Sequence, residues 1–124
     1  MDYDGTAATC GNPNLVCWVD DPTELDLTGR PVFDRAVFPH SANVEFIAPI
    51  SSRHVRMRVI ERGVGETQSC GSGACAVAAV VLRDQGPGSV AIDVPGGRLT
   101  VTLDGDRCVL AGPALIVATG TLAV

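Results

Sequence analysis

The sequence contains no lysine, and all nine basic residues among its 124 residues are arginine. Without a lysine amine, the chain can form neither a Schiff base with pyridoxal phosphate nor the phosphate contact of a Walker A loop. Its net charge of −5 argues against a nucleic-acid-binding module, because such modules carry basic patches. We therefore predict no cofactor, and we expect any chemistry on amino acids to proceed without pyridoxal phosphate.

Long apolar runs are also missing from the sequence. The longest strongly apolar segment, residues 74–82, is less than half of the ~20 residues that a bilayer requires. The first residues include Asp2 and Asp4 and lack the basic and apolar pattern of a signal peptide. We expect a cytoplasmic chain that makes no contact with a membrane.

The cysteines and histidines do not form a metal-binding pattern. No two cysteines have C-x-x-C spacing, and both histidines are distant from the cysteines in sequence, so we predict no zinc site. An odd number of cysteines fits a reducing compartment better than a disulfide framework. The residues concerned are Cys10, Cys17, Cys70, Cys75, Cys108, His40 and His54.

The length suits one domain, and the apolar pattern predicts an α+β fold. Residues 72–83 are small or apolar almost all round, which is typical of a helix buried on every side. Residues 21–31 read as a loop with one helical turn starting at Pro22. We expect mostly antiparallel strands wrapped around this central buried helix, at residues 15–19, 43–50, 55–61, 90–94, 99–103, 108–110, 115–118 and 121–124.

Cys70 stands at the predicted start of the helix, in the sequence ETQSCGSGACAVAAVVL. A thiol reacts as its thiolate, and the positive potential at a helix N-terminus lowers a thiol pKa. Gly71 and Gly73 leave the backbone bare, so a small anion can approach the free amides, while Ser72 can cap the helix or donate a hydrogen bond. The stretch predicts a reactive thiol beside a carboxylate-binding cradle. The alternative is a plain strand-to-helix turn with a buried thiol.

Glu61 and Arg62 end the alternating segment 55–61 just before this turn. Glu61 shares a face with the apolar residues of that segment, and an inward carboxylate is costly unless it has a partner, so its position suggests a site. Arg62 can bind a carboxylate through two hydrogen bonds. The alternative for Glu61 is a carboxylate at a strand end that reaches water. The alternative for Arg62 is a solvated cation.

Two asparagines offer amides that can hold both ammonium and carboxylate groups, namely Asn12 and Asn43. Asparagine in a turn is more often structural, so neither is decisive alone. The remaining thiols of Cys17, Cys75 and Cys108 lie within apolar patterns, and we predict that they belong to the core.

Five segments cover nearly the whole chain: GNPNLVCWVDD, SANVEF, MRVIERGVGETQSCGSGACA, VPGGRL and AGPALIVATGTL. Together, and in this order, they resemble the C-terminal half of diaminopimelate epimerase. The resemblance implies a cofactor-independent isomerase that interconverts LL- and meso-diaminopimelate on the lysine and peptidoglycan route. It also implies two similar domains that hold the small amino-acid substrate between them. Two cysteines then face its α-carbon from opposite sides.

The resemblance assigns roles by position. Cys70 resembles the catalytic cysteine of the C-terminal domain, and Glu61 resembles the acid that tunes the cysteine pair. The matching substrate-binding positions, the last two of which resemble the helix-start amides, are Asn12, Asn43, Arg62, Gly71 and Ser72.

The sequence departs from the family in two ways. The family's N-terminal domain and its cysteine are missing, so we expect a half-site that is inactive or nearly so alone. The partner would be that domain or a second copy, with a homodimer forming through exposed apolar surface. Asn14 stands where the family has a histidine that helps to set the protonation of the cysteines. Cys10 superficially echoes the other domain's cysteine turn, but it lies in a block where the family has no catalytic cysteine.

Two further readings stay open. The chain could belong to another amino-acid racemase or isomerase of the same superfamily, because the substrate's far end would also contact the missing half. It could instead be a binding domain that has lost its chemistry, as the missing domain and Asn14 suggest. A cysteine hydrolase is disfavoured, since no histidine lies within an obvious motif.

Overall fold

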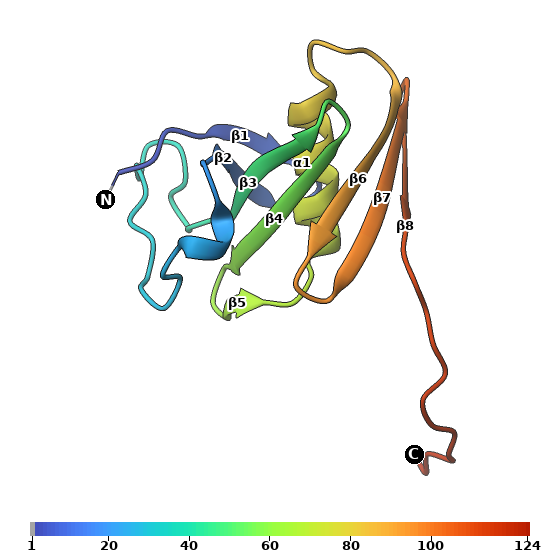
Figure 1. The fold of residues 1–124 in the computed structure, drawn as a ribbon. Coiled ribbons are helices and arrows are strands. Elements are labelled where there is room, and N and C mark those ends of the chain that lie inside the picture. Colours follow the sequence, from blue (N-terminus) through green and yellow to red (C-terminus); the bar gives the residue numbers. More distant parts are fainter. Residues whose placement is uncertain (1) are drawn as a thin grey trace.

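The computed structural model describes residues 2–124, which form an eight-stranded sheet and one α-helix (Figure 1). Along the path β1-β2-β3-β4-β6-β7-β8 each strand pairs with the next, and β5 pairs with β4 off this path. The elements are β1 (Thr6–Thr9), β2 (Pro13–Trp18), the 3-10 helix η1 (Pro22–Glu24), β3 (Asn43–Ser51), β4 (His54–Glu61), β5 (Gly65–Thr67), α1 (Gly71–Leu82), β6 (Gly88–Val94), β7 (Gly97–Asp104) and β8 (Arg107–Ala111).

Most of the elements predicted from sequence are confirmed, with ends shifted by at most two residues. Neighbouring strands are antiparallel except for the parallel pairs β2–β3 and β4–β6. The helical turn expected at Pro22 is the 3-10 helix η1. The chain therefore combines a strand-rich sheet with one helix, as an α+β composition requires.

The alternation of β4 places its apolar residues against α1. Val55, Met57 and Val59 are 1%, 0% and 1% exposed and belong to the same core cluster as the helix. Successive strand residues point to opposite faces, so Glu61 follows them on the helix side. The face assigned to β4 from its sequence is thus confirmed.

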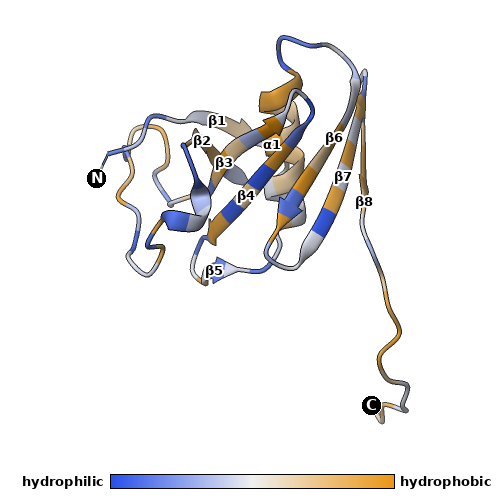
Figure 2. Ribbon diagram, viewed as in Figure 1, coloured by the Kyte–Doolittle hydropathy of each residue, from blue (hydrophilic) through white to orange (hydrophobic). Residues whose placement is uncertain are grey.

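Helix α1 lies in the curl of the sheet and contacts strands at both edges of the sheet, namely β1 and β8. Figure 2 shows that the helix is mostly hydrophobic. The expectation that it is buried on every side is wrong: Ala79 is exposed and Cys75 is half-buried. The reason is that β1 and β8 do not pair with each other, so the curl stays open along one side. Within residues 2–124 no helix is long and apolar enough to cross a membrane.

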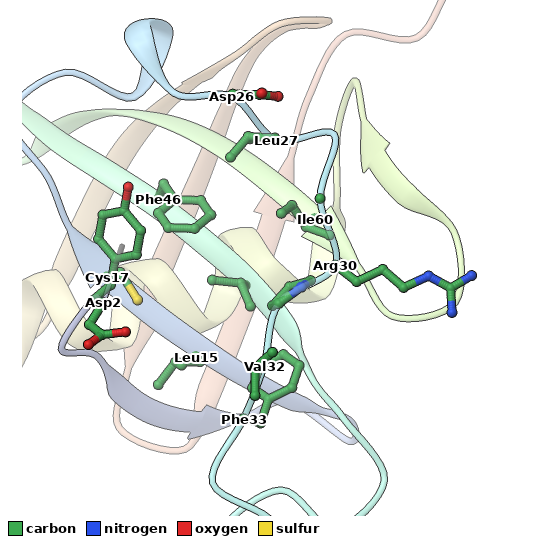
Figure 3. Close-up of a pocket in the computed structure, with 14 residues that line it drawn as sticks. Asp2, Leu15, Cys17, Asp26, Leu27, Arg30, Val32, Phe33, Phe46 and Ile60 are labelled. Carbon is green, nitrogen blue, oxygen red and sulfur yellow. The ribbon is translucent and has the colours of Figure 1, made fainter.

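The other face of the sheet carries a second apolar cluster beneath the segment that joins β2 to β3. Cys17 is 1% exposed there, as predicted, and packs with Val44, Phe46 and Ile60. A pocket opens beside this cluster, with Cys17 and Phe46 in its wall (Figure 3). Because the sheet separates this pocket from α1, it lies away from Cys70.

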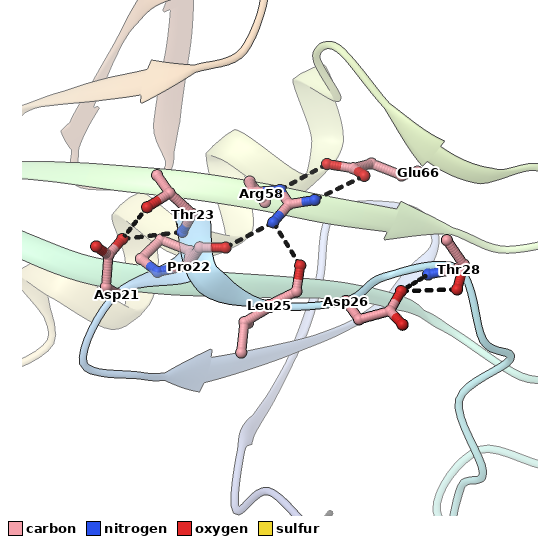
Figure 4. A network of polar contacts seen from close by, with 8 residues as sticks. All are labelled: Asp21, Pro22, Thr23, Leu25, Asp26, Thr28, Arg58 and Glu66. Carbon is pink, nitrogen blue, oxygen red and sulfur yellow. Dashed lines mark hydrogen bonds and ion pairs between the residues drawn. The ribbon is translucent and has the colours of Figure 1, made fainter.

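Arg58 fastens the η1 segment to the sheet (Figure 4). Its guanidinium donates to the Glu66 carboxylate from Nε at 2.7 Å and from Nη2 at 2.8 Å. Its Nη1 donates to the carbonyl oxygens of Pro22 and Leu25, both at 2.8 Å. A planar guanidinium with several donors suits this arrangement, and Arg58 thereby joins β4, β5 and the loop after β2.

The predicted closing strands at 115–118 and 121–124 are wrong. Residues 112–124 form no strand and extend away from the sheet as an exposed tail (Figure 1). Leu115, Ile116 and Val117 are 87%, 86% and 88% exposed. An apolar alternating segment becomes a strand only when another strand offers hydrogen bonds, and none lies beside the tail within residues 2–124.

Candidate functional site

Three polar residues form a row across the helix-facing side of the sheet. Asn14 of β2 pairs with Asn43 of β3, and the β3–β4 register places Glu61 next to Asn43 on the other side. The row lies where these strands meet the start of α1, and Asn14 and Asn43 are 0% and 5% exposed. Buried amides require partners, so this row must be connected to the groups around it.

The asparagine amides form a chain of hydrogen bonds that reaches the helix. Asn43 Nδ2 donates to Asn14 Oδ1 at 3.2 Å, and Asn14 Nδ2 donates to the Asn12 carbonyl at 3.0 Å. Asn12 Nδ2 then donates to Ser72 Oγ at 3.1 Å, in the first turn of α1. Sequence reasoning treated Asn14 as a lost histidine, whereas the structure makes it the link between Asn12 and Asn43.

Cys70 is the N-cap residue of α1, with extended backbone angles and no side-chain capping bond. The Ala74 N–H donates to the Cys70 carbonyl at 2.9 Å and begins the helical ladder. The amides of Gly71 and Ser72 precede that first bond, in the positions that lack an intrahelical acceptor. Ser72 does not cap the helix. Its hydroxyl instead contacts Asn12 and lies 3.7 Å from Cys70 Sγ.

The predicted low pKa of Cys70 is not found in this chain. Burial raises the pKa of its thiol, which is only 6% exposed, and this outweighs the lowering by the Gly73 amide and the Ser72 hydroxyl. The negative charge of Glu61 raises the pKa further, as does that of Glu45 once it ionises above about pH 8. The thiolate at the helix start is therefore disfavoured by desolvation, contrary to the dipole argument taken alone.

Glu61 and Arg62 occupy different positions relative to this network. Glu61 accepts a short hydrogen bond from the hydroxyl of Thr67, so the inward carboxylate has the partner that its position demands. The Arg62 N–H donates to Asn43 Oδ1 at 2.8 Å, but its side chain is exposed. The structure brings Arg62 to the site through its backbone and leaves its guanidinium outside the network.

Glu45 is a buried residue of this site that the sequence analysis missed. It is 0% exposed, and neither carboxyl oxygen has a hydrogen-bond partner among the described residues. Burial raises its pKa to about 8, the proximity of its own backbone N–H partly offsets this shift, and the charge of Glu61 adds to it. The alternation of β3 offered the signal, since Glu45 must share a face with Asn43.

Gly73 explains how Glu45 fits beneath the helix. A Cβ added to Gly73 would lie 2.5 Å from Glu45 Oε1, well inside van der Waals contact. The glycine therefore lets a carboxyl group approach the first turn of α1 from below. Asn12 Oδ1 is also buried and has no partner among residues 2–124, so the network keeps one free acceptor near Ser72.

A metal site requires several ligating side chains that converge on one point. Within residues 2–124, no group of three or more histidine, cysteine, aspartate or glutamate side chains is arranged to hold a metal ion. The candidate site offers a thiol, helix-start amides, amide side chains and two carboxyl groups. Such a set can bind a carboxylate and exchange a proton with a carbon acid.

Solved structures first define the fold class. A PhzC/PhzF protein from Clostridium difficile matches with a TM-score of 0.54 at 21% identity, over 84% of this chain and 40% of its own. A PhzF-family protein from Enterococcus faecalis matches with a TM-score of 0.52 at 16% identity, over 86% and 40%. The chain thus has a fold that is also found in part of each of these two proteins.

The sequence comparison then identifies the family. The diaminopimelate epimerase profile matches residues 6–117, and the chain belongs to this family. It is 51% identical to diaminopimelate epimerase from Acidothermus cellulolyticus, over 96% of this chain and 41% of the relative. It is 47% identical to diaminopimelate epimerase from Rhodococcus jostii, over 97% of this chain and 44% of that relative. The chain spans less than half the length of these curated relatives.

Proposed function

We propose that this chain is one domain, equivalent to the C-terminal half of a diaminopimelate epimerase, and that it carries one half of a two-cysteine site. In this proposal α1 is the central helix of the domain, and its N-terminus is the wall that faces the substrate. The observation that carries it is the placement of Cys70. Cys70 is the N-cap residue of α1, so its thiol stands at the helix start beside free amides and the Asn12–Ser72 contact.

The amides of Gly71 and Ser72 would hold the carboxylate next to the reacting carbon. Helix-start amides suit an anion because they lack intrahelical acceptors and lie at the positive end of the dipole. The free Asn12 Oδ1 would accept from an ammonium group. Each amide atom of Asn43 has one protein partner, so Asn43 would hold Asn14 and the Arg62 backbone N–H in place beside the substrate. The exposed Arg62 guanidinium would reach a second carboxylate.

The reaction moves one proton on and another off the α-carbon. A thiolate on one face takes the α-proton as the carbanion forms, and a thiol on the opposite face gives its proton to that carbon. Cys70 would serve one face, and the partner half would supply the other sulfur. Glu61 would influence which form Cys70 takes, because its charge raises the pKa of that thiol.

A non-catalytic binding domain is the second candidate, and one observation favours it. Burial raises the pKa of Cys70, and the fully buried Asn14 provides no titrating group nearby. The cradle would then hold an amino acid without exchanging its proton. Another amino-acid isomerase of the same superfamily would use the same Cys70 chemistry on a different substrate.

Reconstitution tests the proposal. The chain is mixed with the N-terminal half of the Acidothermus cellulolyticus relative, and conversion of LL- to meso-diaminopimelate is followed by chiral chromatography. We expect conversion in the mixture and in a Cys108→Ser control, and its loss with Cys70→Ser. If the halves bind each other and the Cys70→Ser mixture is as active as wild type, the proposal is wrong. Binding without conversion in the wild-type mixture supports the non-catalytic domain.

A further inference from the structure

Three cysteines that the proposed reaction does not use converge on the open side of the sheet. Cys75 lies on α1, Cys10 directly follows β1, and Cys108 lies on β8. All three are free thiols, Cys75 being half-buried and the other two exposed. They therefore stand where the helix passes between the two unpaired sheet edges.

The β7–β8 register fixes the direction of the Cys108 side chain. Cys108 pairs with Leu103, and Leu110 pairs with the buried Val101. Directly paired residues share a face, so Cys108 and Leu110 both point toward α1. Leu110 confirms this direction independently, because its Cδ2 lies 3.0 Å from the Cβ position of Gly71 at the helix start.

The helix brings Cys75 to the matching position. Cys75 follows Gly71 by one turn, which advances ~6 Å along the helix on the same face. Cys108 is separated from Leu110 by two strand positions, or ~6.6 Å on the same face. Cys75 and Cys108 can therefore meet one helical turn along α1, and two residues along β8, from the place where Leu110 contacts Gly71. In agreement, burial and then the neighbouring thiols of Cys108 and Cys10 raise the pKa of Cys75 to about 12.

We propose that Cys75 and Cys108 form an oxidation site, at which hydrogen peroxide closes a disulfide between α1 and β8. The bond would fasten the edge strand β8, which leads into the exposed tail, to the helix that carries the candidate cradle. Cys10 is the second neighbour of Cys75, and its thiol influences Cys75 less than that of Cys108 does. We assign the bond to Cys108 because the β7–β8 register turns its side chain toward α1, whereas Cys10 lies just after β1.

The chemistry needs one peroxide for each disulfide. The exposed Cys108 attacks first, as its thiolate. Its sulfur bonds to one peroxide oxygen, the O–O bond breaks, and the departing hydroxide leaves as water after taking a proton. The Cys75 sulfur, after losing its proton, attacks the sulfenic sulfur of Cys108, and the second oxygen leaves as water. Two thiols are oxidised to one disulfide and one peroxide is reduced to two waters.

Peptide mapping of the intact 124-residue chain tests this site. The reduced protein is treated with hydrogen peroxide, blocked with an alkylating agent, digested and analysed by mass spectrometry with and without reductant. We expect a reducible peptide pair joining Cys75 to Cys108, while Cys17 on the other sheet face stays alkylatable after unfolding. Cys108→Ser should abolish the pair, and the matched control Cys10→Ser should retain it.

Hydrogen exchange provides a second readout. Closing the bond should slow amide exchange in β8, and reductant should restore the original rate. A dominant bond from Cys10 to Cys75 or to Cys108, oxidation without any internal disulfide, or loss of the pair in Cys10→Ser would overturn the proposal. None of these outcomes depends on activity, so failure of the proposed function and failure of this site are distinguishable.

Discussion

Glu45 is the residue whose environment departs most from what its chemistry prefers. A carboxyl group with no exposure and no partner is strongly disfavoured as an anion, which is why burial raises its pKa to about 8. At neutral pH the folded chain therefore holds Glu45 protonated beneath the first turn of α1. A neutral carboxyl leaves the positive potential of the helix start uncancelled, which favours an anion bound above it.

The pH dependence of stability follows from this shift. Below the ordinary value of 4.5 Glu45 is protonated in both states, so burial costs little. Between 4.5 and about 8 only the unfolded chain ionises it, so the free energy of unfolding falls by up to about 1.4 kcal/mol per pH unit. Above about 8 both states are ionised and the loss becomes constant.

Glu45→Gln removes this titration and tests the account. Urea unfolding of both proteins from about pH 5 to about pH 8 should show the variant gaining on wild type as pH rises. Every other group titrates in both proteins, so the difference between them isolates Glu45. Parallel stability curves across this range would show that Glu45 is ionised in the folded state.

At the scale of elements, the start of α1 depends on a fit between Gly73 and Glu45. Gly73→Ala should gain about 1 kcal/mol of helix propensity and lose about 1–3 kcal/mol to overpacking, since the new Cβ would lie 2.5 Å from Glu45 Oε1. We expect net destabilisation in wild type. In a Glu45→Ala background the same substitution should become neutral or stabilising, measured by urea unfolding as a double-mutant cycle.

Gly29→Ala is the matched control, because nothing lies within 4 Å of the Cβ position there. It should show the same effect in both backgrounds. Equal effects of Gly73→Ala in both backgrounds would mean that Glu45 does not press against the helix start.

The sequence predicted those helices and strands that are specified by a local pattern of apolar, polar and turn residues. Alternation in β4 and the apolar run of α1 specify which face is buried, and turn residues mark the hairpins after the helix. The tail is different. Residues 115–118 have a strand-like composition, but whether they pair depends on a neighbouring strand that composition cannot reveal. The exposure of Cys108 has the same cause, since among the described strands β8 pairs only with β7.

The parts of the candidate site that depend on residue type and local spacing could be predicted from the sequence. A cysteine followed by Gly-Ser-Gly before an apolar run does mark the start of α1. The raised pKa of Cys70 was not predictable, because it is the balance of burial against two hydrogen bonds, and burial is a property of the packed fold. The link through Asn14 was likewise missed, because it depends on β2 and β3 being parallel neighbours.

At the scale of the whole molecule, the chain covers 41% and 44% of two curated relatives, and its tail exposes apolar side chains. Exposed apolar side chains lose contact with water when a partner covers them, so the tail should favour association. The second half of the site would then come from that partner. In this proposed assembly Cys70 would lie at an interface, and the partner would change its surroundings from those in the isolated chain.

The most direct test of this account is hydrogen exchange at the α-carbon in deuterated water. Sedimentation first shows that the chain associates with the N-terminal half of the Acidothermus cellulolyticus relative. Diaminopimelate is then incubated briefly with the chain, with that N-terminal half, or with both. We predict that only the mixture forms isomerised product, that this product carries deuterium while the remaining substrate does not, and that Cys70→Ser abolishes its formation. Association without any exchange, or exchange that persists undiminished in Cys70→Ser, would contradict the assignment of Cys70 as one of two proton carriers.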